Sequence, residues 1–145
     1  MKTYKASHSE LTTAKPEDVW AVWSKVDEWP QWDEGISAAK PNGKFEVGHT
    51  FMLTPKGAPN ALEVKFVDVV PNERFVDETV LPFGKIRSSH FVKKEGDKTR
   101  VTHVIEAEVA PEQADFFEKA IWAGMEDGVA QSVRNITQHA EGKKT

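Results

Sequence analysis

The sequence predicts an α+β domain in which helices cover one face of a curved antiparallel sheet. Three observations support this class. A long amphipathic helical pattern ends the chain, a run of about six strand-like segments precedes it, and one further strand with two short helical segments opens the chain. A long helix across a strongly curved sheet often encloses a cavity, so we expect an internal pocket.

The composition is that of one soluble globular domain. The chain has 145 residues, of which 39% are hydrophobic and 29% are charged. We assign residues 1–141 to a single domain and 142–145 to a loose tail. No cysteine is present, no signal peptide begins the chain and no apolar run could span a membrane, so a cytoplasmic protein is expected. The net charge of -4, without a basic stretch, gives no support for a nucleic-acid partner.

The first part of the chain predicts one strand and two short helices. Tyr4–Thr13 has the composition of a strand, and Pro16 with two acidic residues behind it begins a helix. A second short helix begins near Asp27 and ends at Gly35. Four of the five tryptophans fall in this region, and an aromatic core under the two helices is favoured over a ligand cage. They are Trp20, Trp23, Trp29 and Trp32.

The middle of the chain predicts antiparallel strands separated by turns. Apolar and polar residues alternate within each segment, and proline, asparagine or glycine residues stand between segments. The predicted strands are Ile36–Lys40, Val47–Thr54, Ala61–Val70, Glu73–Leu81, Lys85–Lys94 and Lys98–Val109.

The segment Pro111–His139 predicts one long helix that needs a broad apolar surface to lie across. Trp122 falls on its polar side with Glu118 and Glu126, where it would cover a sheet edge or form a dimer contact. The predicted buried stripe is Ala114, Phe117, Ile121, Met125, Gly128, Val129 and Ile136.

Two glycines interrupt the apolar side of this helix. Gly124 and Gly128 lie four residues apart, and each costs the helix up to ~1 kcal/mol relative to alanine. Close packing of the helix on the sheet is the favoured interpretation. Room left for a ligand is the alternative.

The order of elements resembles the SRPBCC superfamily. The similar features are a Val19-Trp20 pair in the first helix, the Trp29 and Trp32 stretch, and the hairpin that ends in Thr99–His103. The resemblance implies a START-like, helix-grip fold, as in the birch-pollen allergen, with a hydrophobic cavity between sheet and helix. Members of the superfamily bind lipids, hormones, polyketides or quinones, or act as cochaperones. The most similar group is polyketide cyclase/dehydrase-like, and no catalytic motif transfers from it.

The last hairpin predicts a pair of histidines. A two-residue turn at Gly96-Asp97 sets a register in which His90 lies opposite His103. The apolar side of the last strand includes Val101 and Ile105, so His103 points inward with them. Directly opposed residues have Cβ atoms about 5 Å apart, so the two histidines would touch on the cavity side.

The preceding hairpin predicts further polar neighbours. The turn Leu81–Gly84 sets a register that places Asp77 opposite Ser88 and Phe75 opposite His90. An aspartate, a serine and two histidines then cluster among apolar walls.

Three interpretations of this cluster remain open. It is a satisfied buried polar network, a metal site, or an acid/base pair that faces a ligand. A metal site is the weakest, because only two histidines and one aspartate can be placed, and zinc usually takes at least three protein ligands with a known spacing. We predict neither a metal nor another cofactor. The candidate catalytic residues are His90, His103 and Asp77.

The sequence therefore predicts a helix-grip domain, monomer or homodimer, that binds a small hydrophobic molecule. If it is an enzyme, the resemblance implies cyclisation or dehydration of a carbonyl compound. The alternatives are a passive carrier of lipophilic molecules and a cochaperone-like interaction module. The candidate ligand-binding residues are Trp32, Phe51, Phe66, Phe75, Phe83, Ser88, Ile121, Gly124 and Met125.

Overall fold

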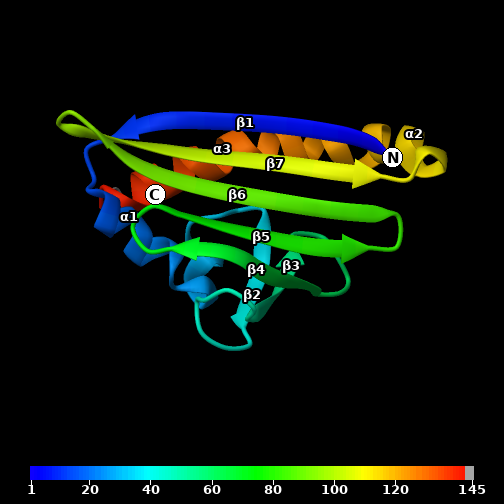
Figure 1. Ribbon diagram of the computed structural model, residues 1–145, viewed down its shortest axis with the longest axis horizontal. Coiled ribbons are helices and arrows are strands. Elements are labelled where there is room, and N and C mark those ends of the chain that lie inside the picture. Colours follow the sequence, from blue (N-terminus) through cyan, green and yellow to red (C-terminus); the bar gives the residue numbers. More distant parts are fainter. Residues whose placement is uncertain (143–145) are drawn as a thin grey trace.

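The computed structural model describes residues 1–142 and shows a seven-stranded antiparallel sheet (Figure 1). Its strand order is β1-β7-β6-β5-β4-β3-β2. Of the predicted tail, residues 143–145 lie outside the described residues. The strands are β1 Lys2–Thr12, β2 Ile36–Pro41, β3 Thr50–Pro55, β4 Leu62–Val70, β5 Arg74–Leu81, β6 Gly84–Glu95 and β7 Lys98–Val109.

The helices lie where the sequence predicts them. Two short ones follow β1, and a long helical segment follows β7 and passes behind the sheet in Figure 1. The predicted α+β arrangement, with a long C-terminal helix across a curved antiparallel sheet, is thereby confirmed. The helices are α1 Pro16–Trp23, the 3-10 helix η1 Val26–Gln31, the 3-10 turn η2 Pro111–Gln113, α2 Ala114–Phe117, the π-helical turn η3 Glu118–Trp122 and α3 Ala123–Ala140.

Both predicted hairpin registers are confirmed. In β6 and β7, His90 pairs with His103, and the connecting turn places Gly96 at φ 65°, a conformation that glycine adopts readily. In β5 and β6, Asp77 pairs with Ser88. Gly84 begins β6 so close to β7 that a Cβ atom there would lie 1.9 Å from the Glu108 carbonyl oxygen, so glycine is required.

The regular pairing of the sheet is interrupted in β4, and a turn precedes β3. The β4–β5 register shifts between Phe66 and Asp68, and such a bulge bends a strand and increases its twist. The predicted strand Val47–Thr54 is too long, because the residues before Thr50 form a turn. In that turn Gly48 has φ 91° and its N–H donates to the Phe66 carbonyl oxygen at 2.9 Å.

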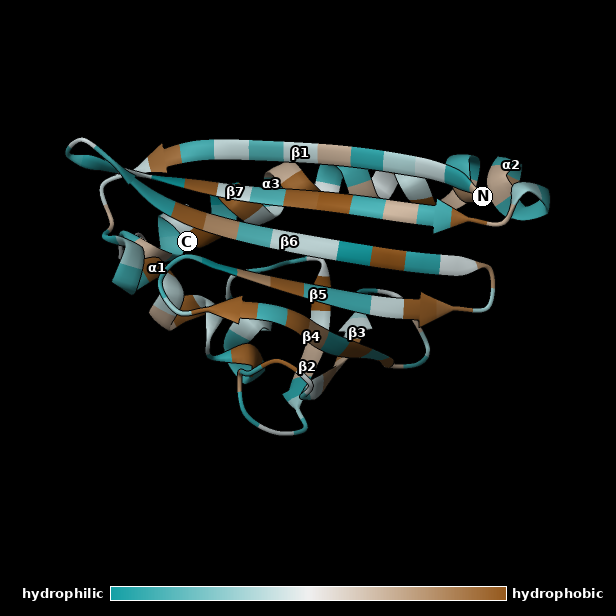
Figure 2. Ribbon diagram, in the orientation of Figure 1, coloured by the Kyte–Doolittle hydropathy of each residue, from teal (hydrophilic) through white to brown (hydrophobic). Residues whose placement is uncertain are grey.

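The buried apolar residues form two separate clusters. One gathers aromatic rings under α1 and η1, including Trp23, Phe51 and Phe75. The other lies between β6, β7 and the long helix and includes Ile105 and Val129. Figure 2 shows hydrophilic and hydrophobic residues alternating along β7, which turns one face of that strand toward the helix.

The π-helical turn changes which side of the long helix is buried. An α-helix repeats every 3.6 residues, whereas a π-type turn inserts an extra residue and rotates the residues that follow it. Phe117 and Trp122, five residues apart, are therefore both buried, and each packs on Tyr4 with ring centroids 5.1 and 5.3 Å away. Trp122 is therefore buried and not on the polar side, and it packs on Tyr4 of the edge strand β1, in agreement with the expectation that it covers a sheet edge.

The same rotation affects the neighbours of Trp122. Ile121, predicted in the buried stripe, is only half-buried. Glu118 contacts β1, because its carboxylate accepts a hydrogen bond from the Tyr4 hydroxyl at 2.7 Å and pairs with Lys2. The start of the long helix is thus tied to β1 by polar and aromatic contacts.

Candidate functional site

A cavity of about 690 Å³ separates the two apolar clusters. Residues of both clusters line it, among them Phe51 and Phe75 on one side and Ile105 and Val129 on the other. A volume of this size suits a small-molecule ligand. The predicted site residues that line it are Trp32, Phe51, Phe75, Asp77, Phe83, Ser88, His90, His103, Ile121, Gly124 and Met125.

Phe66 is the exception among the predicted ligand-binding residues. It is 1% exposed and is not among the residues that line the cavity. The rings of Phe45 and Phe51 lie over it, with centroids 4.5 and 5.0 Å away. Phe45 comes from the segment between β2 and β3. Phe66 therefore belongs to the core behind the cavity wall.

Three rings stack along the sheet at the cavity wall. The His90 and His103 centroids lie 4.2 Å apart with an interplanar angle of 20°. Phe75 stacks on the other face of the His90 ring, with a centroid distance of 4.0 Å and an interplanar angle of 7°. The paired registers hold the three side chains on one face of adjacent strands. His8 pairs with His103 from β1, but its ring nitrogen contacts the Glu10 carboxylate at 2.7 Å.

The two stacked histidines are uncharged near neutral pH. Burial lowers the pKa of His103 to about 4. Burial also lowers the pKa of His90, and the neighbouring His103 lowers it further. Nδ1 of His90 and both ring nitrogens of His103 are buried and have no hydrogen-bond partner among residues 1–142. Buried polar atoms are nearly always paired in native proteins, so three unpaired nitrogens at a cavity wall favour a ligand there.

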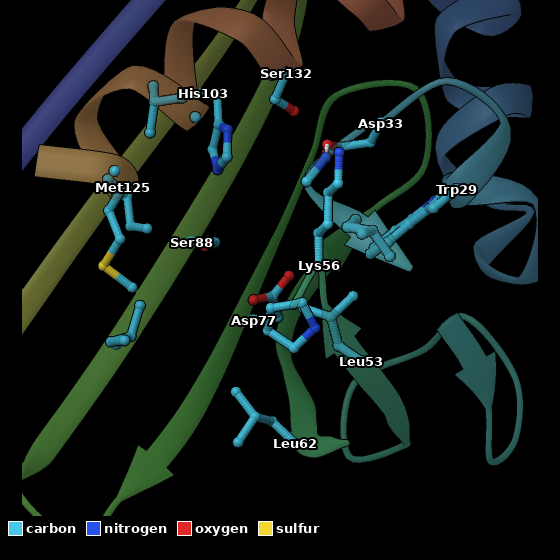
Figure 3. Close-up of a pocket in the computed structure, with 18 of the residues that line it drawn as sticks. Trp29, Asp33, Leu53, Lys56, Leu62, Asp77, Ser88, His103, Met125 and Ser132 are labelled. Atoms are coloured by element: carbon cyan, nitrogen blue, oxygen red, sulfur yellow. Dashed lines mark hydrogen bonds between the residues drawn. The ribbon is translucent and has the colours of Figure 1, made fainter. Parts of the chain in front are cut away.

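Asp77 adds a neutral acid to the same wall. Its carboxyl group is buried, and burial raises its pKa to about 8, with a smaller contribution from the negative charge of Glu78. Within residues 1–142, no group forms a hydrogen bond with it. Ser88, its cross-strand partner, also lines the cavity. The cluster at neutral pH is therefore uncharged and contains both an acid and bases (Figure 3).

The sequence analysis missed several residues that line the cavity. Asp33 and Lys56 lie in loops, where no periodicity indicates a face, and Ser132 lies on α3. Trp23 and Trp29, assigned to the core, contribute both to the core and to the cavity wall. Helical spacing could have identified Ser132, because it lies four residues after Gly128.

The two glycines of the long helix face open space. A Cβ atom added to Gly124 or Gly128 would meet nothing within 4 Å, and both residues line the cavity. Close packing is therefore not the reason for glycine, and the favoured interpretation in the sequence analysis is wrong. The glycines leave room on the cavity side of the helix.

Alanine at either glycine is expected to stabilise the protein. Gly124→Ala and Gly128→Ala should each raise the free energy of unfolding by about 0.5–1 kcal/mol, because alanine favours the helix and meets no neighbour. Urea unfolding measures this. Gly96→Ala is the control and should destabilise, since Gly96 has φ 65°. Destabilisation by either helix variant would show that the space is filled by neighbouring groups.

Within residues 1–142, no cluster of three or more histidine, cysteine, aspartate or glutamate side chains could hold a metal ion. The same residues contain no helix that is long and apolar enough to cross a membrane.

The family described as polyketide cyclase / dehydrase and lipid transport matches residues 3–141. Among solved structures, norcoclaurine synthase from Thalictrum flavum is similar over 99% of this chain and 98% of its own, with 18% identity and a TM-score of 0.76. The Zhui aromatase/cyclase from Streptomyces sp. R1128 is similar over 97% and 94%, with 11% identity and a TM-score of 0.75. No curated protein sequence matches. These structural likenesses support the helix-grip fold.

Proposed function

This chain belongs to the polyketide cyclase / dehydrase and lipid transport family, and on that premise we propose that its cavity binds one small, largely apolar molecule, of which the part beside His90, His103 and Asp77 is uncharged. The polar group of this molecule hydrogen-bonds to His90, His103 or Asp77. Membership supports hydrophobic ligand binding or cyclase activity in general. The specific assignment rests on one observation, the cluster of buried, unpaired and uncharged polar groups in an apolar cavity.

Charge decides which kind of ligand fits this end of the cavity. A charged group placed beside neutral histidines and a protonated Asp77 would lose its hydration without gaining an opposite charge. A carbonyl or phenol group loses less on desolvation. A carbonyl or phenol oxygen can accept a hydrogen bond from the Asp77 carboxyl group, and a phenol O–H can donate one to an imidazole nitrogen.

In the catalytic form of this proposal, the two kinds of group act on a carbonyl compound. A neutral imidazole accepts a proton from the carbon next to the carbonyl group, while protonated Asp77 donates its proton to the carbonyl oxygen, which yields an enol. Enol formation is the step that cyclisation and dehydration share. His90 and His103 are the candidate bases, and Asp77 is the candidate acid.

The other candidate functions differ in what they require of the interior. A passive carrier needs the cavity but not the acid and bases. A cochaperone-like module needs an exposed docking surface and has no use for a cavity, and the volume of about 690 Å³ favours ligand binding over it.

A fluorescent probe tests the location of binding. The uncharged dye N-phenyl-1-naphthylamine should bind the wild-type protein and become brighter. Gly128→Leu should abolish this, because the new side chain enters the open space on the cavity side. Gln138→Leu is the matched control on the exposed side of α3 and should bind the dye as the wild type does. Equal binding by all three proteins would place the dye outside the cavity.

The role of the histidines is tested with a second pair of probes. In a variant with both His90→Phe and His103→Phe, 2-naphthol should displace the dye about tenfold less well, because the polar contacts are lost. Naphthalene, which has no polar group, should displace it as before. If 2-naphthol binds the variant as well as the wild type, both histidines have only a packing role.

Native mass spectrometry of the protein purified from its own host would identify a molecule bound in the cavity.

A further inference from the structure

A second polar group of residues lies where two loops meet at the cavity. We call Trp32, Asp33 and Lys56 the rim subsite. The backbone N–H of Lys56 donates to the Gly35 carbonyl oxygen at 2.9 Å, and Ile36 pairs with Pro55, so the loop after η1 and the end of β3 are joined. Figure 3 shows the Lys56 side chain extending toward Asp33, away from the strand that carries His103.

Two members of the rim subsite are donors without partners. The Trp32 side chain is 8% exposed, and its Nε1–H is buried with no hydrogen-bond acceptor in the described part of the chain. Within residues 1–142, the Lys56 ammonium group has no ion-pair or hydrogen-bond partner. Neither an indole N–H nor an ammonium group can accept a hydrogen bond. A ligand group at the rim must therefore be an acceptor, and Lys56 favours one with a negative charge.

The one acid of the rim is already engaged. An Asp33 carboxylate oxygen accepts a hydrogen bond from the Gly35 N–H at 2.9 Å. Burial raises the pKa of Asp33, and the hydrogen bond from the Gly35 N–H lowers it in part. Among the described residues that line the cavity, Lys56 is the one whose side chain carries a positive charge at neutral pH. This charge is available to a ligand.

We propose that the ligand of this cavity is an amphipathic acid, whose carboxylate is held at the rim by Lys56 and the Trp32 N–H. This inference rests on the proposed function. It adds that the end of the ligand at the rim carries a carboxylate group. The uncharged body and any carbonyl or phenol group enter the cavity toward His90 and His103, while the charge stays at the rim near solvent. An acid is therefore bound without burial of its charge beside Asp77.

Displacement of N-phenyl-1-naphthylamine by dodecanoate and by dodecan-1-ol tests the rim. The two molecules share a chain and differ in their charge. Lys56→Met keeps the apolar stem and removes the ammonium group, so dodecanoate should bind about five- to tenfold more weakly, while dodecan-1-ol binds as before. Trp32→Phe keeps an aromatic ring and should also weaken dodecanoate selectively.

Two further variants control for charge in general. Lys65→Met removes an exposed lysine from β4, at the position opposite Glu78. Lys65 is not among the residues that line the cavity, so this variant should change neither affinity. Asp33→Asn removes the acid and should strengthen dodecanoate binding.

Equal dodecanoate affinity in wild-type and Lys56→Met protein would overturn the rim assignment. If dodecan-1-ol still displaces the dye and Gly128→Leu still abolishes dye binding, the cavity proposal stands while the rim proposal falls. If neither molecule displaces the dye from the wild-type protein, both proposals fail.

Discussion

Replacing Asp77 by asparagine is expected to stabilise the protein strongly above pH 8. Burial raises the pKa of Asp77 from 3.8 to about 8, so the folded protein binds a proton that the unfolded chain releases over this interval. Each pK unit corresponds to 1.36 kcal/mol, which makes the full effect ~6 kcal/mol. Asparagine is neutral at every pH and avoids this loss.

The sign of the pH dependence follows from the directions of the shifts. The Asp77 contribution is fully present below pH 3.8 and is lost as the pH rises toward and through about 8. The histidines act in the opposite sense, because their contribution is present above 6.5 and is lost as the pH falls through about 4 for His103. Wild-type stability should therefore rise from pH 4 to about 6.5 and fall from there to pH 8.

Urea unfolding at intervals of pH measures this profile. In Asp77→Asn the fall between pH 6.5 and 8 should disappear, while the rise below 6.5 should become steeper. Asp97→Asn removes an exposed carboxylate from the β6–β7 turn and should leave the profile as in the wild type. A wild-type profile that is flat from pH 6.5 to 8 would contradict a buried carboxyl group at Asp77.

Trp122→Ala is expected to lower the free energy of unfolding by about 3–5 kcal/mol. Trp122 is 9% exposed, and its ring packs on those of Tyr4 and Phe117 with centroids 5.3 and 6.0 Å away. Removal of a large buried ring leaves a cavity that its neighbours fill only in part. The expected loss is a large share of the ~5–15 kcal/mol that a domain of this size usually has.

Phe116→Ala is the matched control for this variant. Phe116 lies in the same helical segment but is 62% exposed, so its replacement should change stability by less than about 0.5 kcal/mol. Urea unfolding followed by circular dichroism measures both, because this signal does not depend on tryptophan. Equal losses in the two variants would contradict the rotation of the helix at the π-helical turn.

The strands and their registers were predictable because the signals are local. Alternation fixes which face of a strand is apolar, and a two-residue turn fixes which residues lie opposite one another. Those two rules place His90 beside His103 and Asp77 beside Ser88, as the structure shows. The buried polar cluster could therefore be predicted from the sequence, although the function of these residues is a proposal.

The phase of the long helix was not predictable from spacing alone. A regular 3.6-residue period predicts Ile121 inward and Trp122 outward. With the π-helical turn Glu118–Trp122, Trp122 is buried as well, while Ile121 still lines the cavity. The turn occurs where Tyr4 of β1 packs on two helix rings and bonds to Glu118. These contacts join residues more than a hundred positions apart, which no local pattern records.

The fold class, the order of elements and the facing pairs in the last two hairpins can be read from the amino-acid sequence. The open space at Gly124 and Gly128, the packing of Phe45 on Phe66 and the position of Lys56 at the rim became known from the structure. Pairing within a hairpin depends on neighbours along the chain. These three features depend on side chains that are far apart in the sequence. They come together only when the sheet curls around the helix.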